Sequence, residues 1–213
     1  MNVVMVHGFA DTGRLFHRMS ERLEARGHRC LAPTFHPRDG RLGIPDLSGK
    51  VGRFIEDNVE PGAALALVGF SMGAIVACHY LQALGGARRA RAFFSISGPH
   101  RGTATAYCYP GAGTRQMRPG SAFLKGLEAG RSGLDGIFIH TYRTPLDLLV
   151  VPSASSRIPG VPELVVWCPF HSMMPGDRRV VDHIAGELDR LGSASAPPDM
   201  SRAWRSCPGL RQS

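Results

Sequence analysis

The sequence contains no apolar run as long as the roughly 20 residues that a membrane-spanning helix needs. Its first eight residues, Met1–Gly8, carry no basic segment and no small-residue cleavage site, so they do not resemble a secretory signal. They lead directly into an apolar segment typical of a core strand. We therefore expect a protein without a transmembrane segment, which is cytoplasmic or is a secreted form whose leader has been trimmed.

Cysteine is scarce and shows neither close pairs nor the spacing of a metal site. The five cysteines are Cys30, Cys78, Cys108, Cys168 and Cys207. An odd number without a pattern favours a reducing compartment, although it leaves one disulfide open. We expect no bound metal.

Lysine is nearly absent. Lys50 and Lys125 are the only lysines among 25 basic residues, and the net charge is +8. Positive charge attracts nucleic acids and anionic surfaces. The arginines, however, are scattered and are not interleaved with aromatic residues along a helix face, as in many nucleic-acid-binding proteins. The sequence favours a solvated, arginine-rich surface, and we expect no nucleic-acid partner.

A chain of 213 residues has the length of one α/β domain with a sizeable core. Short apolar, β-branched runs predict six strands. These runs lie at Val3–Val6, Cys30–Ala32, Ala64–Val68, Ala92–Ile96, Gly136–His140 and Leu164–Trp167. Amphipathic helical segments alternate with them, which is typical of a mostly parallel sheet with helices on both faces.

We assign residues 1–192 to this single domain. Residues 101–133 interrupt the alternation, because they contain two prolines and several glycines and show one short helical pattern, at Ser121–Glu128. A long stretch without clear elements is often functional or mobile, so it is a candidate flap. Its apolar residues could line an acyl pocket or pack on the edge of the sheet. Residues 193–213 lack periodicity and are predicted to form a flexible tail.

The motif Gly69-Phe70-Ser71-Met72-Gly73 lies between an apolar strand and an apolar helix. This context is typical of a nucleophile elbow, in which a strained turn exposes the serine. Gly69 and Gly73 let strand and helix approach closely, because they have no Cβ. A serine alcohol needs a base and a group that orients this base. The pattern therefore predicts that Ser71 is a nucleophile with two partners.

Two side chains occupy the positions in the order of elements that such partners require. His171 follows the last predicted strand and precedes the final helix, and Asp147 follows the preceding strand. Asp135 lies before that strand, at the wrong end of the sheet. Asp177 and Asp182 lie on or near the final helix, where an acid more often serves the helix terminus. We therefore predict the order Ser71, Asp147, His171.

The reaction also needs donors for an oxyanion. The backbone N–H of Met72 begins the helix after Ser71, where unpaired amides favour negative charge. The second candidate is the N–H of Phe9, in the loop after the first strand.

Taken together, Val6-His7-Gly8-Phe9, the serine motif, the segment Ser97–Thr103, Asp147 and His171 resemble an α/β-hydrolase. More closely, the chain is similar to compact bacterial lipases and esterases of the lipase A type, over roughly residues 2–192. The resemblance implies a minimal six-stranded α/β-hydrolase fold. It also implies that Ser97–Thr103 borders an acyl pocket. We expect this pocket to include His7, Gly8, Phe70, Pro99, Tyr107 and Phe170.

These features predict a hydrolase that cleaves carboxylic esters, acyl lipids included, through an acyl-enzyme on Ser71, without a cofactor. A thioesterase or an amide or lactone hydrolase with the same three residues is the first alternative, since the acyl-enzyme chemistry is shared. The second alternative is a non-catalytic binding protein on a hydrolase scaffold. The presence of all three side chains argues against it. The physiological substrate and the oligomeric state stay open.

Overall fold

The computed structural model describes residues 1–193. Six strands form one sheet in the order β2-β1-β3-β4-β5-β6, and each neighbouring pair is parallel. The strands are β1 (Asn2–Val6), β2 (Arg29–Leu31), β3 (Leu65–Phe70), β4 (Ala90–Ile96), β5 (Phe138–Arg143) and β6 (Glu163–Val165). This architecture confirms the predicted six-stranded α/β fold.

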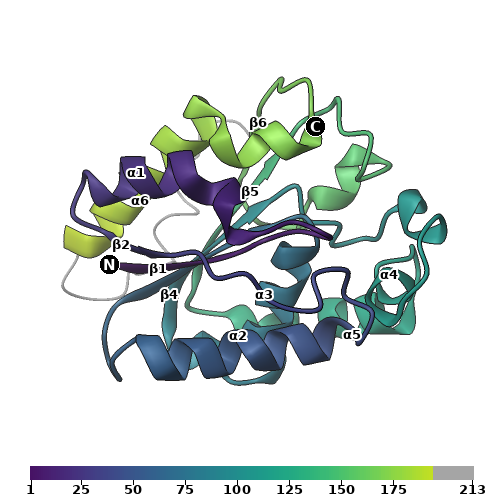
Figure 1. The fold of residues 1–213 in the computed structure, drawn as a ribbon, viewed down its shortest axis with the longest axis horizontal. Coiled ribbons are helices and arrows are strands. Elements are labelled where there is room, and N and C mark those ends of the chain that lie inside the picture. Colours follow the sequence, from purple (N-terminus) through teal and green to yellow (C-terminus); the bar gives the residue numbers. More distant parts are fainter. Residues whose placement is uncertain (194–213) are drawn as a thin grey trace, which may run out of the picture.

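Helices cover both faces of the sheet (Figure 1). The α-helices are α1 (His17–Glu24), α2 (Ile44–Asn58), α3 (Met72–Ala83), α4 (Ala112–Gln116), α5 (Ala122–Ala129) and α6 (Arg178–Ser193). The 3₁₀ helices are η1 (Gly13–Phe16), η2 (Gly86–Arg88), η3 (Ala104–Tyr107), η4 (Arg131–Leu134), η5 (Ser153–Ser156) and η6 (His171–Gly176). Helices α1 and α6 pack on one face, and α2 and α3 pack on the other.

Strand β3 shows how the core forms on both sides of the sheet. All six of its residues are buried. Successive side chains of a strand point to opposite faces, so Leu65 and Leu67 join the cluster with α2 and α3, whereas Ala66 and Val68 join the cluster with α1 and α6. This burial explains why the strand is a continuous apolar run in the sequence.

The strand order reverses direction between β1 and β3. The chain passes from β1 to β2 on one side and then returns to β3 on the other side of β1. In open α/β sheets, the loops at the carboxyl ends of such neighbouring strands diverge and leave a crevice that binds ligands. The loop after β1 and the turn after β3 therefore border the crevice where a site is expected.

All six strands differ from their predicted bounds by one to three residues, and β5 and β6 show the reasons. Strand β5 continues to Arg143 instead of ending at His140, because Thr141 and Tyr142 are buried in spite of their polar atoms. Strand β6 ends at Val165, and Trp167 is 66% exposed. Hydroxyl groups at buried positions and an apolar ring at an exposed position mislead a reading by hydrophobicity alone.

The segment 101–133 is more regular than we expected. It contains η3, α4 and α5 and reaches into η4. The predicted short helix corresponds to α5, and the Ser121 hydroxyl caps it by accepting a hydrogen bond from the Leu124 N–H at 3.2 Å. Glycine and short element length hid the other helices from a periodicity argument. The predicted tail at 193–213 falls, apart from Ser193, outside the described residues.

Candidate active site

Ser71 occupies a sharp turn between β3 and α3. Its backbone angles, φ 53° and ψ −123°, lie in a region that residues other than glycine rarely adopt. Its N–H donates to the Ile96 carbonyl at 2.9 Å, and its carbonyl accepts from the Ala74 N–H at 3.0 Å. These two bonds hold the strained turn between the sheet and the helix. Such strain is typical of a nucleophile elbow.

The glycines on both sides of Ser71 are required by close backbone contacts. A Cβ on Gly69 would collide with the backbone of Ala74, and one on Gly73 would collide with the Val6 carbonyl oxygen. Both obstacles are main-chain atoms, which cannot move aside as the end of a flexible side chain can. The two glycines therefore allow α3 to start directly against β1 and β3.

Asp147 and His171 form a buried pair. The Nδ1 atom of His171 lies 2.7 Å from Oδ2 of Asp147, and both residues are almost fully buried. The other carboxylate oxygen, Oδ1, accepts hydrogen bonds from the N–H groups of Leu149 at 2.9 Å and Val150 at 2.8 Å. The ring of Phe70 packs against the imidazole, with ring centroids 4.7 Å apart. The carboxylate is thus held from two sides, and it fixes the orientation of the imidazole.

The pKa of Asp147 reflects these contacts. Burial by itself raises the pKa of the carboxyl, but the hydrogen bond and charge of His171 and the two backbone donors outweigh burial and lower it below its ordinary value. Asp147 is therefore a carboxylate at neutral pH. A carboxylate accepts hydrogen bonds only, so Nδ1 of His171 carries the proton and Nε2 of the neutral ring is an acceptor.

A cavity of about 110 Å³ lies beside this pair, and both Ser71 and His171 line it. No hydrogen bond joins the Ser71 hydroxyl to His171 within residues 1–193. Hydrogen bonds between catalytic groups are often long in unliganded proteins and tighten when substrate binds. The arrangement places a hydroxyl and an imidazole with a free acceptor nitrogen at one cavity.

Two backbone amides at the same place are unused. In the part of the chain that the structure describes, neither the Phe9 N–H nor the Met72 N–H donates a hydrogen bond to another protein group. Met72 is the first residue of α3, where the first amides of a helix lack partners within the helix. Phe9 itself lines the cavity. Unpaired amides beside a serine hydroxyl are suited to bind a developing negative charge.

The residues that the sequence places in the pocket have different positions in the structure. Pro99 lines the cavity. Gly8 is next to Ser71, since a Cβ on Gly8 would lie 3.1 Å from Ser71 Cβ. Phe70 is buried against His171 and lies outside the lining. Tyr107 and Phe170 are mostly exposed and also lie outside the lining.

His7 has a structural environment. Its Nε2 accepts a hydrogen bond from the Phe35 N–H at 2.9 Å, and its Nδ1 lies 2.9 Å from the Gly8 carbonyl oxygen. A neutral imidazole with Nε2 as acceptor donates from Nδ1, so both of its nitrogens are satisfied. Burial lowers the pKa of His7, which keeps the ring neutral. The hydrogen bonds of His7 therefore fix the loop after β1 against the backbone at Phe35.

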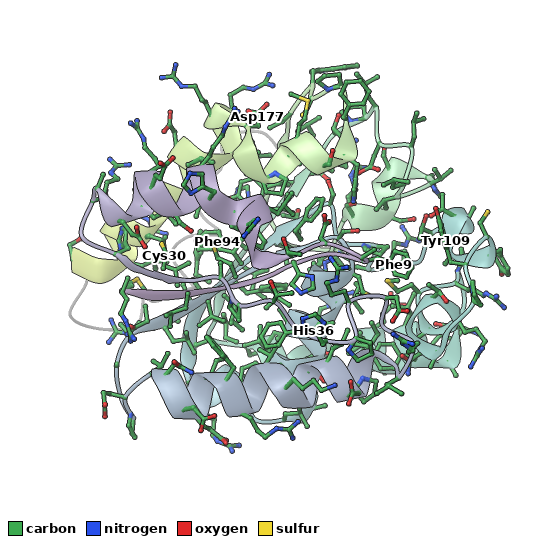
Figure 2. All side chains as sticks on the ribbon, in the orientation of Figure 1. Phe9, Cys30, His36, Phe94, Tyr109 and Asp177 are labelled. Atoms are coloured by element: carbon green, nitrogen blue, oxygen red, sulfur yellow. The ribbon has the colours of Figure 1, made fainter. Side chains whose placement is uncertain are left out.

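Sequence reasoning missed part of the cavity wall. Thr103 belongs to the segment expected to border the pocket, and Tyr109 and Met117 belong to the candidate flap. The lining residues that sequence reasoning did not single out are Asp11, Thr105, Ala106, Thr114, Leu149 and Val150. They come from the loop after β1, from the segment after β4 and from the loop after β5. Position directly after a strand that ends at the site is a usable signal for Asp11. Figure 2 shows Phe9 and Tyr109 near each other at this end of the molecule, and their ring centroids are 5.2 Å apart.

Exposed apolar side chains surround the same region. Most of the large apolar residues that are exposed belong to loops after β4, β5 and β6. They are Tyr107, Tyr109, Leu146, Leu148, Leu149, Val151, Trp167, Phe170 and Met173. Contiguous exposed apolar patches often mark binding sites. We call these side chains the apolar rim.

The other acids near the end of the chain have their own partners. Asp177 binds Arg179 at 2.7 Å, and Asp182 binds Arg22 at 3.0 Å, both at exposed or half-exposed positions. Asp135 is exposed at the end of η4, before β5. Within residues 1–193, no group of three or more His, Cys, Asp or Glu side chains is placed to hold a metal ion. None of the described helices is both long and apolar enough to cross a membrane.

Comparisons with known proteins identify the family and the fold. A family model described as the alpha/beta hydrolase family matches residues 3–211. A pyrethroid hydrolase from Sphingobium faniae is similar in structure, with a TM-score of 0.62, 17% identity, and coverage of 91% of this chain and 99% of that one. A mature lipase from Bacillus licheniformis has a TM-score of 0.66 and 15% identity, with coverage of 89% of this chain and 91% of that one. Lipase B from Aspergillus fumigatus has a TM-score of 0.73 and 16% identity, with coverage of 94% of this chain and 54% of that one. No curated protein matches significantly.

Proposed function

Because the chain belongs to the alpha/beta hydrolase family, we propose that it is a serine hydrolase that cleaves carboxylic esters through an acyl-enzyme on Ser71. The observation that carries this proposal is the buried Asp147–His171 pair, whose imidazole lines the same cavity as the strained serine. A structural role for Ser71 would not require a strained backbone or a cavity. Among the similar solved structures are two lipases and a pyrethroid hydrolase, and these names support an ester bond as the target.

In the proposed mechanism, His171 Nε2 takes the proton of the Ser71 hydroxyl as its oxygen attacks the ester carbonyl carbon. The same nitrogen then gives this proton to the leaving alcohol, which breaks the ester bond and leaves an acyl group on Ser71. Water repeats the sequence and releases the acid. Asp147 stays ionised throughout, holds Nδ1–H toward itself and stabilises the imidazolium that forms.

The amides of Phe9 and Met72 are the proposed oxyanion donors. Each is free in the described residues, and Met72 also lies at the positive end of the α3 dipole. Loss of one donor of this kind costs about 3–4 kcal/mol of transition-state stabilisation in measured cases.

The cavity sets the proposed acyl specificity. Its volume of about 110 Å³ is small beside the roughly 300–1,000 Å³ of typical small-molecule pockets. Ala106 and Met117 belong to the core cluster and also supply apolar surface to the cavity, whereas Leu124 of α5 belongs to that cluster but lies outside the cavity lining. We assign residues 103–117 as the acyl wall and 122–134 as support. The proposed substrate is an ester of a short acyl chain.

The alternatives differ in the leaving group or in catalysis itself. A thioester, amide or lactone would pass through the same acyl-enzyme, and the apolar cavity does not distinguish among them. An ester is favoured by the names of the similar structures. A non-catalytic binding protein would have no use for the strain at Ser71.

A direct test compares Ser71→Ala with Ser132→Ala, which removes an exposed hydroxyl outside the cavity. Rates are measured on p-nitrophenyl esters from acetate to octanoate, beside acyl-thioesters, and labelling is measured with a fluorophosphonate. We expect the wild type and S132A to hydrolyse short esters and to be labelled. We expect S71A to do neither while melting at a similar temperature. Equal ester hydrolysis by S71A would overturn the proposal, and inactivity of all three proteins would favour the binding protein.

A further inference from the structure

Asp11 is the acidic side chain of the cavity wall that the proposed mechanism does not use. It follows β1 in the same loop as Phe9 and is half-buried. The point where a Cβ on Gly8 would lie is 3.1 Å from Ser71 Cβ and 3.2 Å from Asp11 Oδ2. The carboxylate and the proposed nucleophile therefore flank the same small space.

The Asp11 carboxylate has no structural partner in the part of the chain that the structure describes. Within residues 1–193, Asp11 forms no ion pair and its side chain forms no hydrogen bond. It does not cap η1, whose N-cap is Thr12 without a side-chain cap. Removing a carboxylate from water without a partner is unfavourable. An unpaired acid in a cavity is a candidate for ligand binding.

The backbone is strained directly before Asp11. Ala10, the residue before it, has a φ of 59°, in the left-handed region that favours glycine. The Ala10 N–H donates to the Arg38 carbonyl at 2.9 Å, and the Asp11 N–H lies 3.3 Å from the Gly8 carbonyl oxygen. Strain of this kind persists only where the surroundings enforce it, and it concentrates at functional sites.

The topology places Asp11 opposite the acyl wall. The loop after β1 and the segment after β4 lie on opposite sides of β3, at whose end Ser71 stands. Residues 103–117, which follow β4, supply apolar surface. An ester bound with its carbonyl carbon at Ser71 and its acyl chain on this wall would direct its alcohol portion toward the loop after β1.

We infer that Asp11 is a specificity-determining residue that faces the alcohol portion of the ester and selects substrates that carry a positively charged amine there. The inference rests on the proposed function. An ammonium group would supply the partner that the carboxylate lacks, at a half-buried site where opposite charges attract more strongly than in water. The titratable groups that interact electrostatically with Asp11 are His7, His171 and Arg38. His7 is held neutral by burial, and the Arg38 guanidinium binds the Ala10 carbonyl oxygen at 3.3 Å.

The test uses two esters of equal shape, acetylcholine and 3,3-dimethylbutyl acetate, which differ only in the positive charge of the alcohol portion. Acid release gives kcat/KM for each, and the ratio of the two values measures selection for charge. We expect a wild-type ratio above 1 and a fall of about tenfold in Asp11→Asn and Asp11→Ser. Asp57→Asn, which neutralises an exposed acid on α2, should leave the ratio unchanged.

The pH profile provides a second readout. Burial raises the pKa of Asp11 above its ordinary value of 3.8. Selection for the cation should therefore be present at high pH and be lost as the pH falls through this raised pKa. In Asp11→Asn the ratio should not depend on pH.

The outcomes separate the inference from the proposed function. If the wild type hydrolyses both esters and the ratio is the same in Asp11→Asn and Asp11→Ser, the inference is wrong and the proposed function stands. If the wild type hydrolyses neither ester and a fluorophosphonate does not label Ser71, the proposed function fails and the inference falls with it. Melting temperatures of both variants show whether a changed ratio comes from the folded protein.

Discussion

Replacing Asp147 by asparagine tests the proposed roles most sharply, because the surroundings dictate how the new amide must lie. Oδ1 of Asp147 accepts from the N–H groups of Leu149 and Val150. Only the carbonyl oxygen of asparagine can take that place, since an amide NH₂ is not an acceptor. The NH₂ group must then replace Oδ2, which lies 2.7 Å from Nδ1 of His171.

This orientation sets the size of the effect. A donor facing Nδ1 forces the imidazole to carry its proton on Nε2, so the nitrogen facing the cavity can no longer accept the proton of Ser71. The equivalent change in a well-studied serine protease lowers kcat by about 10⁴-fold. This corresponds to about 5 kcal/mol at 1.36 kcal/mol per factor of ten. We expect a similar loss in Asp147→Asn with little change in KM, because Asp147 does not line the cavity.

The assay is steady-state hydrolysis of p-nitrophenyl acetate by the wild type, Asp147→Asn and Asp135→Asn. Asp135 undergoes the same chemical change at an exposed position before β5, so this variant should match the wild type. A kcat of Asp147→Asn within tenfold of the wild type would refute the argument from tautomers. Loss of activity in Asp135→Asn instead would show that the acid has been assigned wrongly.

Three further changes test packing, specificity and pH dependence. Gly73→Ala should destabilise the fold by about 3 kcal/mol, because its Cβ meets a β1 carbonyl, whereas Gly186→Ala on α6 has free space and should raise the melting temperature slightly. Met117→Ala should shift the preferred p-nitrophenyl ester to a longer acyl chain and lower the free energy of unfolding by about 2–5 kcal/mol. Leu124→Ala, which is equally buried but lies outside the cavity, should lower the free energy of unfolding by as much and leave the preferred acyl-chain length unchanged. An equal shift of that preference in both variants would contradict the assignment of the acyl wall. The lowered pKa of Asp147 means that its stabilisation is present above pH 3.8 and is lost as pH falls through the folded-state pKa, so urea denaturation should show a weaker acid dependence in Asp147→Asn.

The local geometry around Ser71 was predictable because it depends on neighbours in the sequence. An apolar strand, two glycines and an apolar helix permit few backbone paths, and the observed strain at Ser71 follows from them. Parallel strands all end at the same edge of a sheet, so the order of elements also indicated that Asp147, rather than Asp135, would lie beside His171. The catalytic roles of these residues stay predictions.

The cavity wall was harder to predict because it depends on packing between distant segments. Met117 and Leu124 are apolar residues of one glycine-rich stretch and belong to the same core cluster, yet of these two Met117 alone lines the cavity. Nothing in their spacing separates them. Tyr107 and Phe170 are aromatic residues in loops beside the site, but their side chains are exposed at its rim.

By itself, the sequence determined the class of fold, the alternation of strands and helices, and the strained serine, since hydrophobic periodicity and backbone sterics act over a few residues. Only the tertiary structure decided the two amides that hold the Asp147 carboxylate, the satisfied environment of His7 and the unpaired Asp11 in the cavity. These features depend on which donors, acceptors and apolar surfaces meet when remote loops pack at the carboxyl edge of the sheet. Whether a polar group finds a partner there is decided by that packing.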